Sequence, residues 1–254
     1  MFKHAIVRRP AASLVRGITS RPELGKPDYS RALRQHDAYI AALESCGLSV
    51  EVLDADERFP DSCFVEDVAV CTGRFAMITR PGADSRRDET VSILPVLARH
   101  FNELVSVSEP GTLEGGDVMM VGDRFFVGLS DRTNAEGAGQ LISALERHGY
   151  EGMTVPLSSV LHLKTGLAYL EDGILLVAGE FVQDPLFREF TRIEVRPEED
   201  YAANCIRVNE RVLVPAGFPA TSGRIRDAGL NVLEVDTGEF RKLDGGLSCL
   251  SLRF

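Results

Sequence analysis

The sequence lacks any uninterrupted apolar stretch of the length that crosses a membrane, and no apolar leader follows Met1. We therefore expect no membrane span, no secretory signal peptide and no membrane partner. Its five cysteines are odd in number, irregularly spaced and never arranged as CxxC. This pattern argues against a disulfide framework and a structural zinc site, and it predicts reduced thiols in a cytoplasm.

Positive charge is also in short supply, because 28 Lys and Arg residues stand against 38 Asp and Glu residues, a net charge of −10. Nucleic acid needs a basic surface and is therefore not expected as a partner. A small cationic substrate would be attracted by the same excess of negative charge. The chain also lacks low-complexity segments and an evident linker, and we predict one domain over residues 1–254.

The sequence does contain a weak internal repeat of strand–turn–strand patterns. Each pattern has two apolar runs around a short polar turn, which is a signal for a β-hairpin. The turns follow one another at intervals of about 50 residues, with a shorter last interval, and such spacing is typical of radial repetition. The predicted hairpins cover residues 68–79, 118–128, 167–177 and 205–214.

Two single strands remain at the ends of the chain, at residues 3–8 and 249–254. If they pair, they form a fifth unit, close the ring and remove exposed sheet edges. Pro95 predicts a kink or a late start in one of the helices between the units. Those helices are predicted from apolar spacing and capping residues at 28–47, 85–101 and 133–149. The predicted fold class is α/β, a five-bladed α/β propeller with pseudo-five-fold symmetry.

Reactive polar residues stand directly before each predicted hairpin and near the last strand. Equivalent positions in a ring of like units face the same axis, so we expect these side chains to converge. They include carboxylates, a histidine and a thiol, which are the groups that nucleophilic catalysis by cysteine uses. The set is Asp61, Glu66, Asp67, Glu114, Asp117, His162, Lys164, Asn204, Asp244 and Cys249.

Cys249 follows the glycine pair Gly245 and Gly246 and opens an alternating apolar pattern that predicts a strand. It would thus lie where a loop becomes a strand, a common place for a reactive group on a rigid support. Taken alone, it could equally be a buried core thiol, and His162 between two leucines could be a core histidine. A zinc site built from His162, Cys249 and the acids is a further alternative, although the close ligand spacing of structural zinc sites is missing.

Longer strings extend this set along essentially the whole chain, at 61–67, 78–87, 114–117, 132–134, 161–164, 202–205 and 244–249. In these strings the chain resembles the dimethylarginine dimethylaminohydrolases, and it looks closest to their bacterial form. That family belongs to the guanidine-modifying superfamily with the pentein fold. The resemblance implies a propeller of five ββαβ blades, no metal cofactor and a homodimer.

The resemblance also implies roles for individual residues. Cys249 would be the nucleophile and His162 the general acid and base. Glu114 would be a third catalytic residue and would also lie at the substrate guanidinium. A pair of arginines would hold the substrate carboxylate, backbone groups would hold its amino-acid end, and residues 17–26 would form a lid. The implied substrate-binding residues are Ile18, Asp61, Phe64, Glu66, Asp67, Arg86, Arg132 and Leu243.

The implied activity is hydrolysis of N-omega-methylated arginines to citrulline and an amine, through a covalent thiouronium on Cys249. Two alternatives stay open at this point. One is another hydrolase of small guanidines, including an arginine deiminase-like enzyme. The other is a non-catalytic guanidinium-binding protein, in which loss of the thiol or the histidine would be expected, whereas both are present here.

Overall fold

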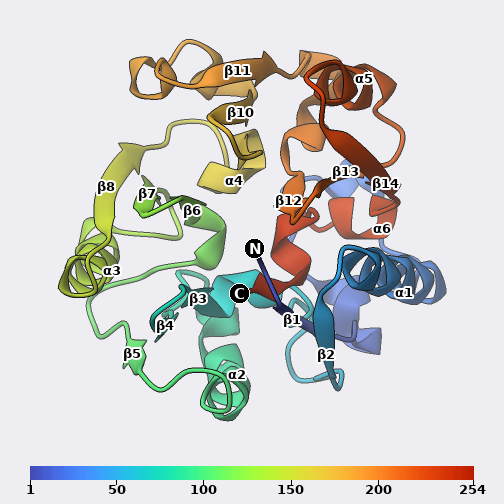
Figure 1. Ribbon diagram of the computed structural model, residues 1–254. Coiled ribbons are helices and arrows are strands. Elements are labelled where there is room, and N and C mark those ends of the chain that lie inside the picture. The colour runs from blue at the N-terminus through green and yellow to red at the C-terminus, as the bar shows by residue number, and fades with distance from the viewer. The chain divides into compact units, whose positions relative to one another are not determined.

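The structure is a computed structural model that describes residues 1–254, with fifteen strands in five sheets of three (Figure 1). The chain forms two compact units. The first unit comprises residues 1–64 and 166–253, and the second comprises residues 65–165 with Phe254. The fold is mixed α/β, as predicted, while the prediction of one domain over residues 1–254 stays a prediction.

The first unit contains three sheets that follow one plan. In each sheet the middle strand pairs antiparallel with one neighbour and parallel with the other. The three sheets, each with its middle strand second, are β15 (Leu252–Arg253), β1 (His4–Arg8) and β2 (Ser49–Leu53); β9 (Leu167–Tyr169), β10 (Ile174–Val177) and β11 (Thr191–Glu194); and β12 (Ile206–Val208), β13 (Arg211–Pro215) and β14 (Asn231–Val235).

The second unit contains two sheets of the same plan, again with one antiparallel and one parallel pair. All four predicted hairpins are therefore confirmed. Several of their turns place a residue at positive φ, at +60° for Gly122, +74° for Gly173 and +53° for Asn209, a region that glycine and asparagine enter readily. The sheets are β3 (Ala69–Cys71), β4 (Ala76–Ile78) and β5 (Leu104–Ser106); and β6 (Val118–Val121), β7 (Arg124–Leu129) and β8 (Glu151–Pro156).

A helix connects the middle strand to its parallel neighbour in four of the five sheets. These helices are α1 (Tyr29–Ser45), α2 (Thr90–Leu97), α3 (Ala135–Arg147) and α5 (Pro219–Asp227). In the remaining sheet two short 3₁₀ turns, Gly179–Val182 and Pro185–Phe187, take the place of the helix. The connections explain the parallel pairing, because a parallel neighbour can be reached only through a crossover.

The predicted helices begin close to where their capping residues lie. The Asp28 side chain accepts the Arg31 N–H at 2.9 Å before α1, and the Asn134 side chain accepts the Gly137 N–H at 2.8 Å before α3. The helix around Pro95 starts late, as expected, because residues 84–89 form a 3₁₀ turn first. Helix α5 was not predicted, since its sequence has few apolar residues and no clear stripe.

Each sheet is entered through a short helical turn, and most of the predicted reactive residues lie in these turns or directly next to them. The turns are Val65–Val68, Gly115–Asp117, α4 (Leu163–Gly166), Pro197–Ala203 and Ser248–Leu250. The prediction that a strand begins at Cys249 is wrong, because this residue lies in such a turn and the strand starts at Leu252. The N–H of Ser248 is bound by a side chain, Oδ1 of Asn204 at 2.9 Å, and so does not enter the sheet.

The terminal strands pair as predicted, with Ala5 opposite Arg253 and Ile6 opposite Leu252. Apolar cores form separately in the two units. In the first unit one core surrounds Tyr39 and Phe240, and in the second unit the core surrounds Phe75. None of the helices combines the length and the apolar character that a membrane crossing needs.

Candidate active site

The predicted site residues fall into two groups, one in each unit. We call the first group the cysteine cluster, and it consists of Ile18, Asp61, Phe64, Leu243 and Cys249 in the first unit. We call the second group the histidine cluster, and it consists of Glu66, Asp67, Arg86, Glu114, Arg132 and His162 in the second unit.

Cys249 is buried and surrounded by hydrogen-bond donors. Its Sγ accepts the Gly246 N–H at 3.5 Å and lies 3.8 Å from Oγ of Ser248. Nδ2 of Asn204 donates to the same sulfur at 4.0 Å. Donors of this kind stabilise a thiolate more than a thiol, because they stabilise the charged form.

The loop before Cys249 is held by two residues from the turn at Pro197–Ala203 and its end. Asn204 fills the space where a side chain on Gly246 would go, since a Cβ there would lie 2.4 Å from Cγ of Asn204. The hydroxyl of the half-buried Tyr201 donates to the Gly245 carbonyl at 2.8 Å. The sequence pattern had drawn attention to Asn204 but not to Tyr201, whose partner is distant in the sequence.

The Asp61 side chain holds Ile18, another predicted residue of the cysteine cluster. Its Oδ1 accepts the Ile18 N–H at 3.0 Å. A Cβ on Gly17 would lie 2.6 Å from that oxygen and 2.8 Å from Leu243, so glycine is required for this close approach. Phe64 packs against Gly245, where a Cβ would lie 2.2 Å from its ring.

The predicted lid segment is tied to the loop that carries the nucleophile. Both the N–H and the hydroxyl of Ser20 donate to the Asp244 carboxylate, at 2.5 and 2.8 Å. Asp244 has a φ of +59°, an uncommon conformation for a residue with a side chain. The two segments are thereby joined at the point where the loop changes direction.

His162 stands at the start of the short helix α4 and forms the centre of the histidine cluster. Its Nε2 lies 2.7 Å from Oε2 of Glu114, and both residues are buried. Burial alone would lower the pKa of His162, but the charge of Asp67 and the hydrogen bond to Glu114 outweigh it and raise the pKa to about 9. The imidazole is therefore protonated at neutral pH.

Asp67 and Arg86 form a buried ion network with Glu89, which was not predicted. Nη1 of Arg86 donates to Asp67 at 2.6 Å, and Nη2 donates to Glu89 at 2.9 Å. Burial would raise the pKa of Asp67, but the charges of Arg86 and His162 lower it on balance. Asp67 also accepts the Gly116 N–H at 3.0 Å, and a Cβ on Gly116 would lie 2.8 Å from the His162 ring.

The two predicted carboxylate-binding arginines differ in their surroundings. The side chain of Arg86 is 7% exposed and carries two ion pairs, whereas that of Arg132 is 20% exposed. The closest ion pair of Arg132 is with Glu114, at 3.9 Å. Glu66, predicted as a substrate contact, is paired with Lys164. The sequence pattern had noted Lys164 without giving it a role.

One atom each of Asp67, Glu114 and His162 could in principle serve a metal ion, since these atoms lie within 4.8 Å of one another. Each of the three side chains already has a partner of opposite or complementary character within the cluster. A metal ion would have to break the His162–Glu114 hydrogen bond and compete with the Arg86 guanidinium. The geometry therefore favours proton chemistry over metal binding at these residues.

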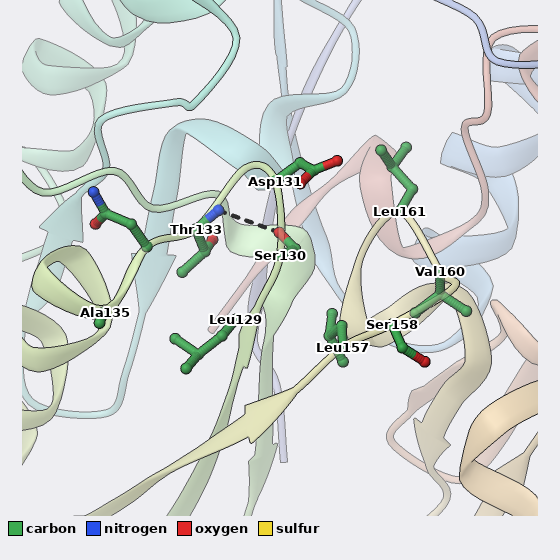
Figure 2. Close-up of a pocket in the computed structure, with 10 residues that line it drawn as sticks. Leu129, Ser130, Asp131, Thr133, Ala135, Leu157, Ser158, Val160 and Leu161 are labelled. Atoms are coloured by element: carbon green, nitrogen blue, oxygen red, sulfur yellow. Dashed lines mark hydrogen bonds between the residues drawn. The ribbon is translucent and has the colours of Figure 1, made fainter.

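A pocket of about 360 Å³ lies beside the histidine cluster (Figure 2). One wall runs from Leu129 to Ala135 and so includes the residues on both sides of Arg132. The opposite wall runs from Leu157 to Leu161 and leads directly to His162. Figure 2 shows the hydrogen bond from the Thr133 N–H to Ser130 within the first wall, at 3.2 Å.

Comparisons with known proteins agree with this description. Residues 25–200 match the family model described as N,N dimethylarginine dimethylhydrolase, eukaryotic. A protein of Pseudomonas aeruginosa named N(G),N(G)-dimethylarginine dimethylaminohydrolase is 59% identical, with 100% of both chains covered.

Two solved structures are similar over 100% of both chains at 58% identity. One is the C249S mutant of the P. aeruginosa enzyme complexed with citrulline, with a TM-score of 0.99. The other is the H162G variant of a dimethylarginine dimethylaminohydrolase as an adduct with S-methyl-L-thiocitrulline, with a TM-score of 0.98. The five sheets of this chain are thus those of the pentein fold that the sequence predicted.

Proposed function

Because the chain belongs to the dimethylarginine dimethylaminohydrolase family, we propose that it hydrolyses N-omega-methylated arginines to citrulline and methylamine or dimethylamine. The observation that carries the proposal is the pair of substitutions in the solved relatives, at positions 249 and 162. In this chain the same numbers belong to Cys249 and His162. Citrulline, bound to one relative, is the product of the proposed reaction.

The proposed substrate carries a guanidinium, which is a planar cation and a poor electrophile. Charge-assisted hydrogen bonds to carboxylates would hold it and keep its positive charge near the central carbon. We assign this role to Asp61 of the cysteine cluster and to Glu66 and Asp67 of the histidine cluster. Glu66 and Asp67 are ion-paired with Lys164 and Arg86. Although burial opposes it, the charges of Arg86 and His162 lower the pKa of Asp67 and so favour the ionised carboxylate that the substrate requires.

The amino-acid end of the substrate carries a carboxylate, for which we propose Arg132 and Arg86. Arg132 is the more exposed of the two and lacks the two close ion pairs that occupy Arg86. We therefore assign the larger share of carboxylate binding to Arg132. Backbone groups near Ile18 and Leu243, with the ring of Phe64, would contact the remainder of the substrate.

In the first step the Cys249 thiolate attacks the central carbon of the guanidinium. A free thiol has a pKa of about 8.5, and a cation bound nearby favours its thiolate form. The Gly246 N–H and the Asn204 amide also donate to the sulfur. The C–S bond forms, His162 gives its proton to the amine, and the C–N bond breaks to leave a thiouronium on the sulfur.

In the second step His162, now neutral, takes a proton from water. The hydroxide attacks the thiouronium carbon to form a tetrahedral adduct. The C–S bond then breaks, the proton left on the former hydroxide passes to solvent, and citrulline leaves while Cys249 returns to its thiolate. The raised pKa of His162 suits the first step, because the imidazole begins each cycle protonated. Proton transfer by such a group typically contributes 10²–10⁴ in rate, on the order of 3–5 kcal/mol.

The test compares Cys249→Ser with Cys46→Ser, a substitution at a half-buried thiol outside the cluster. Dimethylarginine, monomethylarginine and arginine are each supplied, and citrulline and the released amine are quantified. Protein quenched during turnover is digested and weighed. We expect an adduct on the peptide that contains Cys249, and loss of turnover only in Cys249→Ser. Full activity of that variant would disprove the proposal, and strong preference for arginine would favour the arginine deiminase-like alternative.

Other parts of the sequence prediction also stand as proposals. We propose a homodimer, because Val91 and Leu94 on α2 are 72% and 46% exposed and offer an apolar face to a second copy. Sedimentation of the protein with and without Val91→Glu would test it. We also propose a cytoplasmic location, since the reaction needs a reduced thiol. We further propose that residues 1–254 form one catalytic domain. Given the net charge of −10, we propose no nucleic-acid partner.

A further inference from the structure

Asp117 is a fully buried carboxylate that takes no part in the proposed reaction. We propose that Asp117 is a positioning residue, which fixes the turn that carries His162 and the turn that carries Arg132 through its two oxygens. The inference rests on the proposed function, because it assumes that both of those residues act on the substrate. Its test, however, includes a measurement that needs no turnover.

The first oxygen of Asp117 holds the turn of His162. Oδ1 accepts the N–H of Leu163 at 2.9 Å, at the start of helix α4. The first N–H groups of a helix have no partner within it, so this carboxylate caps the helix. His162 precedes Leu163 directly, and its own carbonyl accepts the Thr165 N–H at 3.0 Å. The backbone that carries the imidazole is therefore fixed relative to Asp117.

The second oxygen of Asp117 holds the turn of Arg132. Oδ2 accepts the hydroxyl of Ser130 at 2.7 Å. The same hydroxyl oxygen accepts the N–H of Arg132 at 3.0 Å and the N–H of Thr133 at 3.2 Å. Thr133 in turn accepts the Glu114 N–H at 3.1 Å through Oγ1. One carboxylate thus fixes the backbone of Arg132 through a single serine.

The segments that flank these two turns line a pocket. The pocket of Figure 2 is lined by both flanking segments, at 129–135 and 157–161, which are joined at their first residues by the hydrogen bond from the Leu157 N–H to the Leu129 carbonyl at 3.1 Å. Gly128 leaves room for the carboxylate, since a Cβ there would lie 2.9 Å from Oδ1 of Asp117. Asp117 adds a second connection, because its two oxygens join the turn of His162 to the turn of Arg132.

The charge of Asp117 acts on His162 as well. Burial raises the pKa of Asp117, while His162, Ser130, Thr133 and Leu163 oppose that rise. The carboxylates that face the imidazole are Asp67, Glu114 and Asp117, and all three raise the pKa of His162 against the effect of burial. Removing the charge at position 117 therefore lowers the pKa of His162 even if the geometry survives.

Asparagine cannot reproduce both contacts, although it has the size of aspartate. Its single oxygen can accept either Leu163 or Ser130, and its NH₂ group then faces another donor. On the Leu163 side the NH₂ group meets an N–H. On the Ser130 side it meets a hydroxyl oxygen that already accepts two N–H groups. Asp117→Asn therefore releases at least one of the two turns.

The first experiment compares Asp117→Asn with the unaltered protein by NMR titration of the His162 imidazole in the absence of substrate. We expect the midpoint to move to lower pH, and kcat at neutral pH to fall about tenfold. A purely structural role would lower the melting temperature without moving this midpoint. An unchanged midpoint in a folded Asp117→Asn protein would overturn the inference.

The second variant, Ser130→Ala, keeps the charge and breaks only the contact to the Arg132 turn. We expect KM for the amino-acid substrate to rise about fivefold, the loss of one hydrogen bond, with kcat within twofold and the His162 midpoint unchanged. An unchanged KM would overturn the inference even if Asp117→Asn failed to fold. If the proposed function itself is wrong, the unaltered protein shows no turnover, whereas the imidazole titration still decides the role of Asp117.

Discussion

The cysteine cluster and the histidine cluster are built from different interactions. Around Cys249 the contacts come from neutral groups, an amide side chain, a backbone N–H and glycines that admit their neighbours closely. Around His162 they come from charges, with carboxylates and a guanidinium buried together. The reaction needs a thiolate at Cys249 only when a cationic substrate is bound, but it needs a protonated imidazole at His162 from the start of the cycle.

This difference shows which property each cluster depends on. The cysteine cluster depends on shape, because its hydrogen-bond donors reach the Cys249 sulfur only where glycines, without side chains, let neighbouring groups approach closely. The histidine cluster depends on charge, because buried ions are stable only with their partners. Changes of shape should therefore affect the first cluster most, and changes of charge should affect the second.

The largest effect is expected from Glu114→Gln, which keeps the shape of the side chain and removes its charge. The pKa of His162 should fall, and kcat at neutral pH should drop roughly 10²-fold, the lower end for a general acid and base. Steady-state kinetics would measure this. Glu109→Gln is the matched control, since Glu109 is paired with Arg80 at the surface. An unchanged kcat in Glu114→Gln would contradict the claim that the histidine cluster depends on charge.

Gly246→Ala is expected to be the most damaging change of shape in the cysteine cluster. Its Cβ would lie 2.4 Å from Asn204, and overpacking of this kind costs about 1–3 kcal/mol of unfolding free energy. Urea unfolding and the alkylation rate of Cys249 would both report it. Gly223→Ala is the control, because no atom lies within 4 Å of a Cβ at that position. Asn204→Ala added to Gly246→Ala should restore stability, and its failure to do so would contradict the close fit.

The charge of His162 also makes stability depend on pH. Its folded pKa of about 9 exceeds the ordinary value of 6.5, so the stabilisation is complete below pH 6.5 and lost as the pH rises through 9. The expected loss is about 3 kcal/mol. Urea unfolding at pH 6.5 and 9.5 would measure how steeply the free energy of unfolding changes with pH in the unaltered protein and in His162→Asn. Equal slopes would show that the imidazole does not hold its proton through the cluster.

The smallest effect is expected where the lid meets the nucleophile loop. Ser20→Ala removes the hydroxyl contact to Asp244 and leaves the backbone contact in place. The loss of one exposed hydrogen bond should raise KM about threefold with little change in kcat. Ser45→Ala, which removes a hydroxyl contact to the Ala42 carbonyl outside either cluster, should change neither constant. A large drop in kcat for Ser20→Ala would mean that the lid acts on the thiol itself.

Local signals in the sequence were sufficient for the hairpins and the longer helices. Glycine and asparagine at the turns, and Asp28 and Asn134 at the helix starts, act within a few residues of their own positions. The turn at Cys249 could not be predicted in this way. It depends on Asn204, which is 44 residues from its partner Ser248, whereas the local apolar alternation favoured a strand.

The same limit applied to the candidate site. The repeat predicted that acids, a histidine and a thiol precede the sheets, and all of them except Asp61 and Asp244 lie in or beside such a turn. The partner of Glu66 could not be inferred, because its pairing with Lys164 depends on how turns that lead into different sheets pack. Asp117 appeared in the sequence as part of a glycine-rich turn, and only its two hydrogen bonds indicate a role.

The pairing of β1 with β15 has a consequence for the order in which the protein is made. Strand β1 leaves the ribosome early, but the antiparallel partner that it needs is among the last residues of this chain to be synthesised. The second unit, apart from Phe254, is one continuous segment and can acquire its structure while synthesis continues. A chain interrupted before Cys249 therefore contains every residue of the histidine cluster but no nucleophile.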